Sequence, residues 1–411
     1  MPIAVIILLI TLFTIAFRRI GKVIIPIWLI MTGGALFALL FQQITPLQAL
    51  KAIEPDVMLY LFGVFFIAQA AEESGYLEHF THKLFYHAKT GKHVLFVIIF
   101  VLGFSASLLM NDTIAIVGTP IILHLCKSHK ALIKPLLYAL AFSITISSVV
   151  SPIGNPQNLL IAVKGGMTDP FMDFFKMLAL PSLLNLIICY LVLSYIFKDQ
   201  LRLTIEKTGK SEFKDNQTVN LVRISLMFMI TLVATKIILN IFNPAFKINF
   251  SYIAIIAALP LLCSKQKWFY LKNLDWGTLI FFVSTFILMQ SVWDSGFLQN
   301  NINYYQISFE KPAIIWITSI ILSQFISNVP LVALYVPLIM HQSPTNYKLL
   351  TLAAGSTIAG NLSIIGAASN IIIIQNCEKR GIRGFDFFEF IKLGAPLTLI
   401  NVLIYYFLLR G

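Results

Sequence analysis

Long apolar stretches alternate with short polar breaks along the whole chain. A run of roughly 20 apolar residues lets an α-helix cross the hydrocarbon core of a bilayer. Dividing the chain at its polar breaks predicts an all-α polytopic membrane protein with ten spanning helices. These helices lie near residues 2–17, 23–41, 57–72, 131–163, 177–197, 221–242, 249–263, 276–292, 348–376 and 391–409.

Two further apolar stretches, 93–126 and 313–341, have polar centres. The first is interrupted by Asn111-Asp112-Thr113 and the second by Ser327-Asn328. Because the arms of the second are shorter than the roughly 20 residues needed to cross, we expect it to be a re-entrant hairpin. We expect the same of the first, although its longer leading arm leaves a full crossing open.

Two of the predicted spans, 131–163 and 348–376, contain helix-breaking residues at their centres. In the first, Pro152 and Pro156 remove backbone donors and disfavour helix before them. Gly154 and Gly366 permit a turn in the first and second span, respectively. The sequence therefore predicts two broken helices.

Composition supports a membrane protein. Hydrophobic residues make up 58% of the 411 positions and charged residues only 12%, about half the charged share of a soluble domain. The net charge of +12 comes from basic residues scattered singly between apolar runs. Nucleic-acid binding needs a contiguous basic face, so we expect membrane lipid and no nucleic acid as partners. The four cysteines are isolated and predict neither a zinc site nor disulfides.

Basic residues also predict orientation, because cytoplasmic loops are enriched in Lys and Arg. With ten spans, most of the 30 Lys and Arg residues fall on one side. That side includes 198–220, the only long hydrophilic stretch, which we expect to be a cytoplasmic linker between a first membrane repeat, 1–197, and a second, 221–411. Both termini then lie outside the inner membrane. The first segment carries its charges after its apolar run, the reverse of a cleavable signal peptide, so we expect a retained helix.

The two halves share motifs in the same order. Residues 111–122 read NDTIAIVGTPII and 328–339 read NVPLVALYVPLI; residues 151–161 read SPIGNPQNLLI and 363–373 read SIIGAASNIII. Shared order and shared polar anchors indicate an internal repeat, since apolar composition alone would not supply them. Each half has five crossings, an odd number, so the second copy must be inverted relative to the first.

Transport chemistry is expected where the backbone is broken at membrane depth, because such backbone is tolerated only where protein or water satisfies it. Half-helices that begin at a break direct free N–H groups and a partial positive charge at the centre, which suits an anion, and those that end there offer carbonyls to a cation. Paired asparagines flank these breaks and either bind solute or bond helices together. They are Asn111 with Asn328 and Asn158 with Asn370.

Asp112 is the most informative single residue. A carboxylate inside a membrane costs roughly 2.5 to 3.5 kcal/mol even on the lenient insertion scale. It can couple transport by carrying a proton or by coordinating sodium, or it can be a solvated residue at a tip that reaches water. The charged residues between Glu72 and His87 fit a solvated cytoplasmic helix better than a metal site.

The strings NDTIAIVGTPII, SPIGNPQNLLI, SNVPLVALYVPLI and AGNLSIIGAASNIIII together resemble the ion transporter superfamily. That group includes divalent anion:sodium symporters, citrate-transporter-like permeases, ArsB-type arsenite permeases and NhaD-type sodium/proton antiporters. The resemblance implies a scaffold part and a moving part, elevator-like alternating access, and a homodimer. It also implies substrate and ion sites at Asn111, Asp112, Thr113, Gly154, Asn155, Ser327, Asn328 and Gly366, with sodium at the tips Asn111 and Asn328 and no other metal or cofactor.

The sodium-coupled dicarboxylate members carry Ser-Asn-Thr at both tips, whereas residues 110–113 here read Met-Asn-Asp-Thr. An Asp beside the tip Asn is more similar to the arsenite and antiporter branches. We therefore expect a secondary active transporter of a small inorganic or organic anion, driven by sodium or protons, with a sodium/proton antiporter or an arsenite efflux permease as the alternative. No motif of an intramembrane enzyme is visible, and a passive channel would leave the repeated motifs unexplained.

Overall fold

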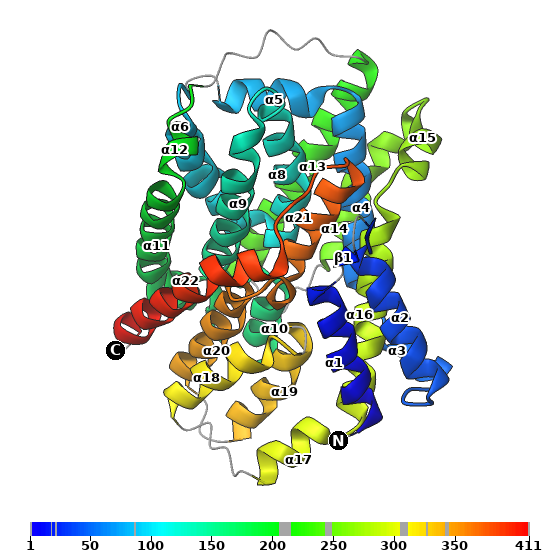
Figure 1. Ribbon diagram of the computed structural model, residues 1–411, viewed down its shortest axis with the longest axis vertical. Coiled ribbons are helices and arrows are strands. Elements are labelled where there is room, and N and C mark those ends of the chain that lie inside the picture. Colours follow the sequence, from blue (N-terminus) through cyan, green and yellow to red (C-terminus); the bar gives the residue numbers. More distant parts are fainter. Residues whose placement is uncertain are drawn as a thin grey trace.

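The computed structural model describes residues 2–17, 19–20, 23–85, 88–204, 215–242, 249–304, 311–325, 328–341 and 345–409. Most of these residues are helical (Figure 1). Within these ranges seven helices are long and apolar enough to cross a membrane: Pro55–Glu73, Gly91–Leu109, Lys130–Ser148, Pro170–Ile196, Asn216–Lys236, Trp276–Asp294 and Phe387–Leu408. The prediction of a largely α-helical, multi-pass membrane protein is confirmed.

The part before the linker begins with α1 and α2, joined by a two-stranded antiparallel ribbon. A π-helical turn, Ile98–Leu102, joins α6 and α7 into one continuous helix. The elements are α1 Ile3–Ala16, β1 Arg19–Ile20, β2 Val23–Ile24, α2 Ile27–Leu40, α3 Pro46–Ala52, α4 Pro55–Glu73, α5 Tyr76–Phe85, α6 Gly91–Val97, α7 Gly103–Leu109, α8 Asn111–Leu125, α9 Ile133–Ser148, α10 Pro156–Lys164 and α11 Pro170–Ile196. A short helix, α12 Lys198–Leu201, lies at the start of the predicted linker.

The part after the linker is also helical, and a 3-10 segment, Leu259–Cys263, extends α14. The helices are α13 Asn216–Phe242, α14 Phe250–Ala258, α15 Lys267–Lys272, α16 Trp276–Asp294, α17 Phe297–Tyr304, α18 Pro312–Leu322, α19 Asn328–His341, α20 Asn346–Ile358, α21 Ala368–Lys379 and α22 Phe387–Leu408. The middle of the predicted linker, 205–214, lies outside the described residues.

Several predicted spans are short as helices. α1 and α2 have 14 residues each, which is about 21 Å at 1.5 Å per residue and less than the roughly 30 Å hydrocarbon core. Of the two interrupted stretches, the second has short arms, with 11 residues in α18 and 14 in α19. The leading arm of the first, Gly91–Leu109, has 19 residues and is long enough to cross.

The chain leaves the helical conformation at the polar centres and at the Pro- and Gly-containing positions. α7 ends at Leu109 and α8 begins at Asn111, and between them Met110 has a φ of 67°. α9 ends at Ser148 and α10 begins eight residues later at Pro156, a residue suited to a first helical position because its missing N–H is not needed there. α20 and α21 are separated by residues 359–367, which form two short 3-10 turns.

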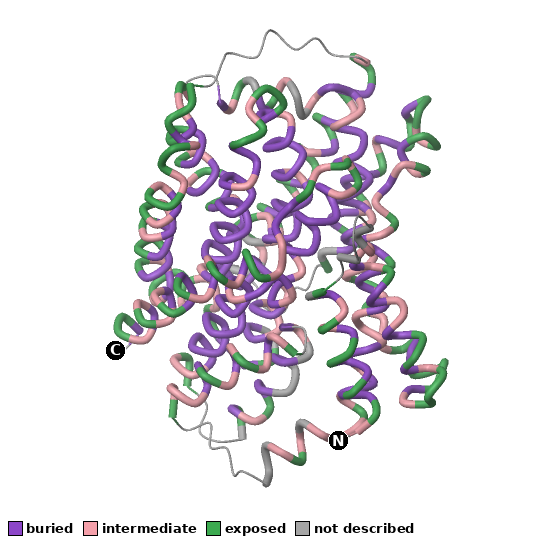
Figure 2. The backbone as a smooth tube through the Cα atoms, viewed as in Figure 1, coloured by how far each residue is buried: buried purple, intermediate pink, exposed green. Residues whose placement is uncertain are grey.

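The helices pack in two groups (Figure 1). The α4 group consists of α1–α4 and α13–α16, and the α9 group consists of α6–α11 and α18–α22. The centre of the α9 group is α9 itself. In the apolar stretch of Lys130–Ser148, which contains α9, 83% of the residues are buried, whereas in that of α22 only 28% are buried. Figure 2 shows the same gradient, with buried residues along α9 and exposed residues along the outer helices α11 and α22. Exposed apolar faces of this kind suit contact with lipid.

Candidate functional site

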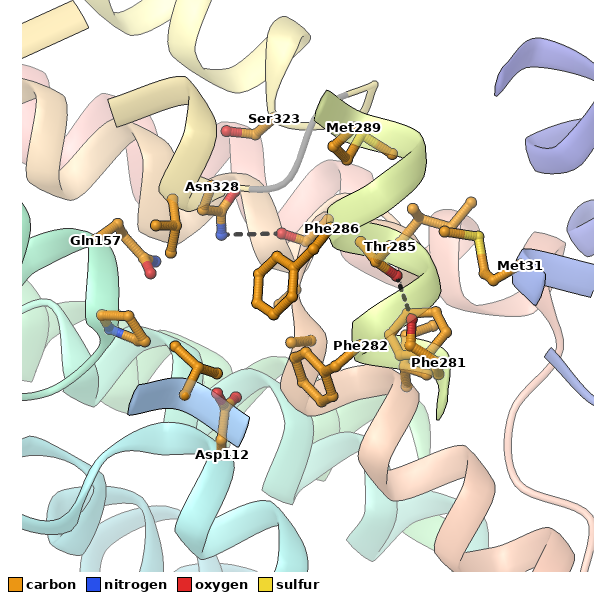
Figure 3. Close-up of a pocket in the computed structure, with 18 of the residues that line it drawn as sticks. Met31, Asp112, Gln157, Phe281, Phe282, Thr285, Phe286, Met289, Ser323 and Asn328 are labelled. Atoms are coloured by element: carbon orange, nitrogen blue, oxygen red, sulfur yellow. Dashed lines mark hydrogen bonds between the residues drawn. The ribbon is translucent and has the colours of Figure 1, made fainter. Parts of the chain in front are cut away.

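The first residues of four helices converge on one cavity of about 90 Å³ between the two groups. α8 contributes Asn111 and Asp112, α10 contributes Pro156 and Gln157, α19 contributes Asn328, and α21 contributes Ala368. Phe281, Phe282, Thr285, Phe286 and Met289 of α16 form the opposite wall (Figure 3). The volume can hold a few water molecules or one small solute.

A backbone hydrogen bond joins the interruption between α7 and α8 to the helix break between α9 and α10. The N–H of Asn111 donates to the carbonyl oxygen of Gly154 at 2.9 Å. The Asn111 Oδ1 accepts the N–H of Asp112, also at 2.9 Å. Both residues are 6% exposed, and both line the cavity. The positive φ of Met110 reverses the chain here, a conformation that is strained for a residue with a side chain.

A hydrogen bond likewise joins the interruption between α18 and α19 to the helix break between α20 and α21. The Nδ2 of Asn328 donates to the carbonyl oxygen of Gly366 at 3.2 Å, the bond drawn in Figure 3. Its Oδ1 accepts no hydrogen bond from the described residues and is buried. Asn328 therefore presents a free acceptor where it lines the cavity. Ser327, the other predicted residue at this tip, lies outside the described residues.

Asn155 and Asn158 lie behind the cavity and stabilise the first break. The Oδ1 of Asn155 accepts the N–H of Asn158 at 2.8 Å and caps α10. The Nδ2 of Asn158 donates to the carbonyl oxygens of Ser148 and Ser151, each at 3.1 Å. Asn158 is fully buried and is not part of the cavity wall. In this structure its amide satisfies backbone that the broken helix leaves without partners.

Asn370 makes the equivalent contacts at the second break. Its Nδ2 donates to the carbonyl oxygens of Gly360 at 2.7 Å and Ser363 at 3.3 Å. Gly360, Ser363 and Asn370 have the same spacing as Ser148, Ser151 and Asn158. The side-chain amides of both asparagines therefore donate to carbonyl oxygens of the broken segments, and the Oδ1 of Asn158 also accepts from the Thr357 hydroxyl on α20 at 3.3 Å.

Thr113 and Gly154 also lie outside the cavity wall. The hydroxyl of Thr113 shares a hydrogen bond with the hydroxyl of Tyr60 on α4. A Cβ at Gly154 would lie 2.1 Å from the carbonyl oxygen of Ser148, so only glycine fits. Of the ten residues singled out from the sequence, Asn111, Asp112, Asn328 and Gly366 line the cavity, whereas Thr113, Gly154, Asn155, Asn158 and Asn370 surround it at the described breaks.

The structure adds wall residues that the sequence did not single out. Gln157 lies two residues after Asn155, in the first turn of α10. Gln324 follows α18, and its side chain donates to the carbonyl oxygen of Ala359 at 2.9 Å and accepts from the Ser363 hydroxyl at 2.7 Å. The aromatic wall on α16 carries no sequence signal, because a Phe-rich helix is equally typical of a face in contact with lipid.

The charge of the cavity is unusual for an anion site. No Lys, Arg or His belongs to the described residues of its wall, and Asp112 is the ionisable group among them. Each helix N-terminus carries a partial positive charge of roughly half an elementary unit. The described residues contain no group of three His, Cys, Asp or Glu arranged to hold a metal ion. Binding of an anion in this cavity would therefore depend on the helix N-termini and on neutralisation of the Asp112 charge.

Comparison with known proteins identifies the family. A model of the citrate transporter family matches residues 5–348. The chain belongs to this family. The resemblance of its motifs to the ion transporter superfamily is thereby confirmed, and the protein is a membrane transporter.

Similar proteins cover nearly the whole chain. The putative transporter arsB of Dictyostelium discoideum is 21% identical over 90% of this chain and 85% of its own length. The silicon efflux transporter LSI3 of Oryza sativa subsp. japonica is 23% identical, covering 89% of each chain. An uncharacterized transporter of Mycobacterium tuberculosis is 24% identical over 85% of this chain and 84% of its own.

Proposed function

We propose that the protein is a secondary active transporter that moves a small inorganic or organic anion, coupled to sodium or protons, by elevator-like alternating access. The observation that carries the proposal is the convergence of four helix N-termini on one cavity whose described wall residues include one carboxylate, that of Asp112. Free N–H groups at helix N-termini stabilise negative charge. A coupling cation or proton at Asp112 removes the charge that would otherwise repel the substrate.

The same proposal includes two inverted repeats, with ten spans and two re-entrant hairpins. Packing supports it, because contacts recur in equivalent pairs: α4 packs on α14 as α16 packs on α2, and α8 packs on α21 as α19 packs on α10. In Figure 1, α10 lies below α9 whereas α21 lies above α20, as expected when the second copy is upside down. A homodimer with both termini outside and the linker in the cytoplasm completes the arrangement.

Orientation is tested by labelling single cysteines at Lys210 and Gly411 with an impermeant reagent. The two positions should react from opposite sides of the membrane, because an odd number of crossings separates them. Reaction from the same side would contradict the inverted arrangement.

Asp112 is the coupling residue of this proposal. If its carboxylate carries a proton, Asp112→Asn should abolish accumulation driven by a proton gradient and make the remaining exchange insensitive to pH between about 6 and 8. If it coordinates sodium together with carbonyls of the tip, the variant should instead need more sodium. Uptake by proteoliposomes under separately imposed sodium and proton gradients, with a panel of anions, distinguishes the two. A folded variant with unchanged accumulation, pH dependence and sodium dependence would contradict the proposal.

A second candidate function is efflux of a small hydroxylated weak acid, as in an arsenite permease. The absence of Lys, Arg and His from the described cavity wall favours it, since a solute that is neutral in solution needs no cationic partner. Relatives named as arsB and as a silicon efflux transporter agree. Arsenite belongs in the same uptake panel. Sodium/proton exchange without any added solute would instead support the antiporter alternative.

A further inference from the structure

Polar contacts between the two helix groups are concentrated towards one face of the protein. This face, here called the linker side, carries α12 and the start of α13 and lies at the top of Figure 1. The C-terminal ends of α4 and α21 both point towards it (Figure 1). At these ends, Glu72 and Gln69 of the α4 group meet Arg380 and Lys379 of the α9 group.

Arg380 forms the strongest of these contacts. Its Nε donates to Glu72 Oε1 at 3.0 Å, and its Nη2 donates to Glu72 Oε2, so the pair is bidentate. The Nη1 donates to the carbonyl oxygen and to Oδ1 of Asn376, one turn earlier on α21, at 2.9 and 3.0 Å. The side chains of Arg380 and Glu72 are only 20% and 35% exposed. A preorganised, half-buried and bidentate pair is stronger than an ordinary surface ion pair.

Further hydrogen bonds join α21 to the α4 group beside this ion pair. The Nζ of Lys379 donates to Gln69 Oε1 at 3.2 Å and to the carbonyl oxygen of Asn273, just before α16. One turn earlier on α21, Gln375 accepts a hydrogen bond from the hydroxyl of Thr278 on α16. α21 is therefore bonded to both α4 and α16 along its C-terminal half.

The first repeat lacks this arrangement. At the spacing of the two aligned breaks, Met167 and Thr168 take the positions of Lys379 and Arg380. The described residues of α10, the counterpart of α21, form no side-chain hydrogen bond or ion pair with the α4 group. Among the described residues, the polar contacts that join the two groups are therefore unequal on the two faces.

We propose that Glu72 and Arg380, supported by Lys379, form a latch that closes the cavity to the linker side. The latch favours the conformation in which the cavity is reached from the opposite side. This inference rests on the proposed alternating access, because the cavity opens to the linker side only when α21 moves away from α4. The pair must then separate in every transport cycle.

The test measures access to the cavity and requires no substrate. Ser323→Cys places a thiol in the cavity wall, in a background in which the exposed Cys263 is replaced by Ser. An impermeant maleimide is applied to vesicles of each orientation. Glu72→Gln and Arg380→Gln should each raise the labelling rate from the linker side by about tenfold, a factor typical of losing a hydrogen bond to a charged group. The double exchange Glu72→Arg with Arg380→Glu should restore slow labelling.

A matched control breaks an ion pair that does not join the two groups. Lys134 and Glu389, 2.9 Å apart, both belong to the α9 group, so Lys134→Gln should leave the labelling rate unchanged. Unchanged labelling in folded Glu72→Gln and Arg380→Gln would overturn the latch, as would an equal increase in Lys134→Gln. Failure of the wild type to transport any anion would instead count against the proposed function, since the labelling result does not depend on transport.

Discussion

Replacement of Asn158 by Ala measures what holds the first helix break together. In an uninterrupted helix the carbonyl of Ser148 would accept the N–H of residue 152, but Pro152 has none. The Asn158 Nδ2 replaces that donor and also bonds the carbonyl of Ser151, which still accepts the N–H of Gly154. Asn158→Ala therefore leaves one buried carbonyl without this donor, at about 1–3 kcal/mol, and removes a second bond worth about 1 kcal/mol. We expect a loss of about 2–4 kcal/mol.

The free energy of unfolding can be measured for the purified protein by denaturant titration in detergent. Asn370→Ala should lose a similar amount, because its Nδ2 also bonds two carbonyls of its break. Asn346→Ala is the control: its Nδ2 bonds Asp173 at an exposed position, and we expect a change within about 0.5 kcal/mol. If Asn158→Ala were as stable as Asn346→Ala, the argument that the asparagine replaces the missing proline donor would be refuted.

Three further changes test other parts of the fold. Met110→Gly should relieve the strain of a φ of 67° but also removes a buried side chain, a loss that costs about 2–5 kcal/mol, so we expect a net loss of stability; an unchanged or higher stability in the same titration would contradict this. Gly154→Ala should prevent folding, since its Cβ would lie 2.1 Å from the Ser148 carbonyl oxygen, so a monodisperse, wild-type-like gel-filtration profile would contradict the clash. The Thr218 hydroxyl donates a hydrogen bond to Asp215 and lowers its pKa. The stability that this bond contributes is therefore present above the ordinary aspartate pKa and is lost as pH falls through the lower pKa of the folded state. Asp215→Asn should reduce the slope of unfolding free energy against pH in that acid range, and an unchanged slope would contradict this.

The helix breaks were predictable because they depend on local chemistry. Proline lacks an N–H, glycine permits a turn, and a polar centre within an apolar stretch cannot remain in lipid, so the residues themselves mark where the helices end. Four residues singled out at these positions, Asn111, Asp112, Asn328 and Gly366, line the cavity. The lengths of α1 and α2 were less predictable, because an apolar run sets an upper limit on a helix but does not show where packing ends it.

The facing wall of the cavity was not predictable for a different reason. Periodicity shows which residues share a face of a helix, but it does not distinguish a face in contact with lipid from one that faces another group of helices. Phe282 and Phe286 of α16 lie one turn apart and line the cavity, yet a sequence with 34 phenylalanines places many such pairs in lipid. Only the arrangement of the two groups assigns this pair to the site.

The motifs shared by the two halves of the sequence also show which contacts could not be predicted. Aligned repeats predict equivalent elements, so the sequence suffices to match Asn158 with Asn370, and the structure gives both the same contacts. Residues without an equivalent carry the difference between the two faces, and their partners come from distant parts of the chain. Glu72, expected from the sequence to be solvated at the end of a span, instead pairs with Arg380 across the two groups. Side chains present in only one half of the sequence thus distinguish the two faces of the described structure, and such charges are the first positions to examine for control of transport.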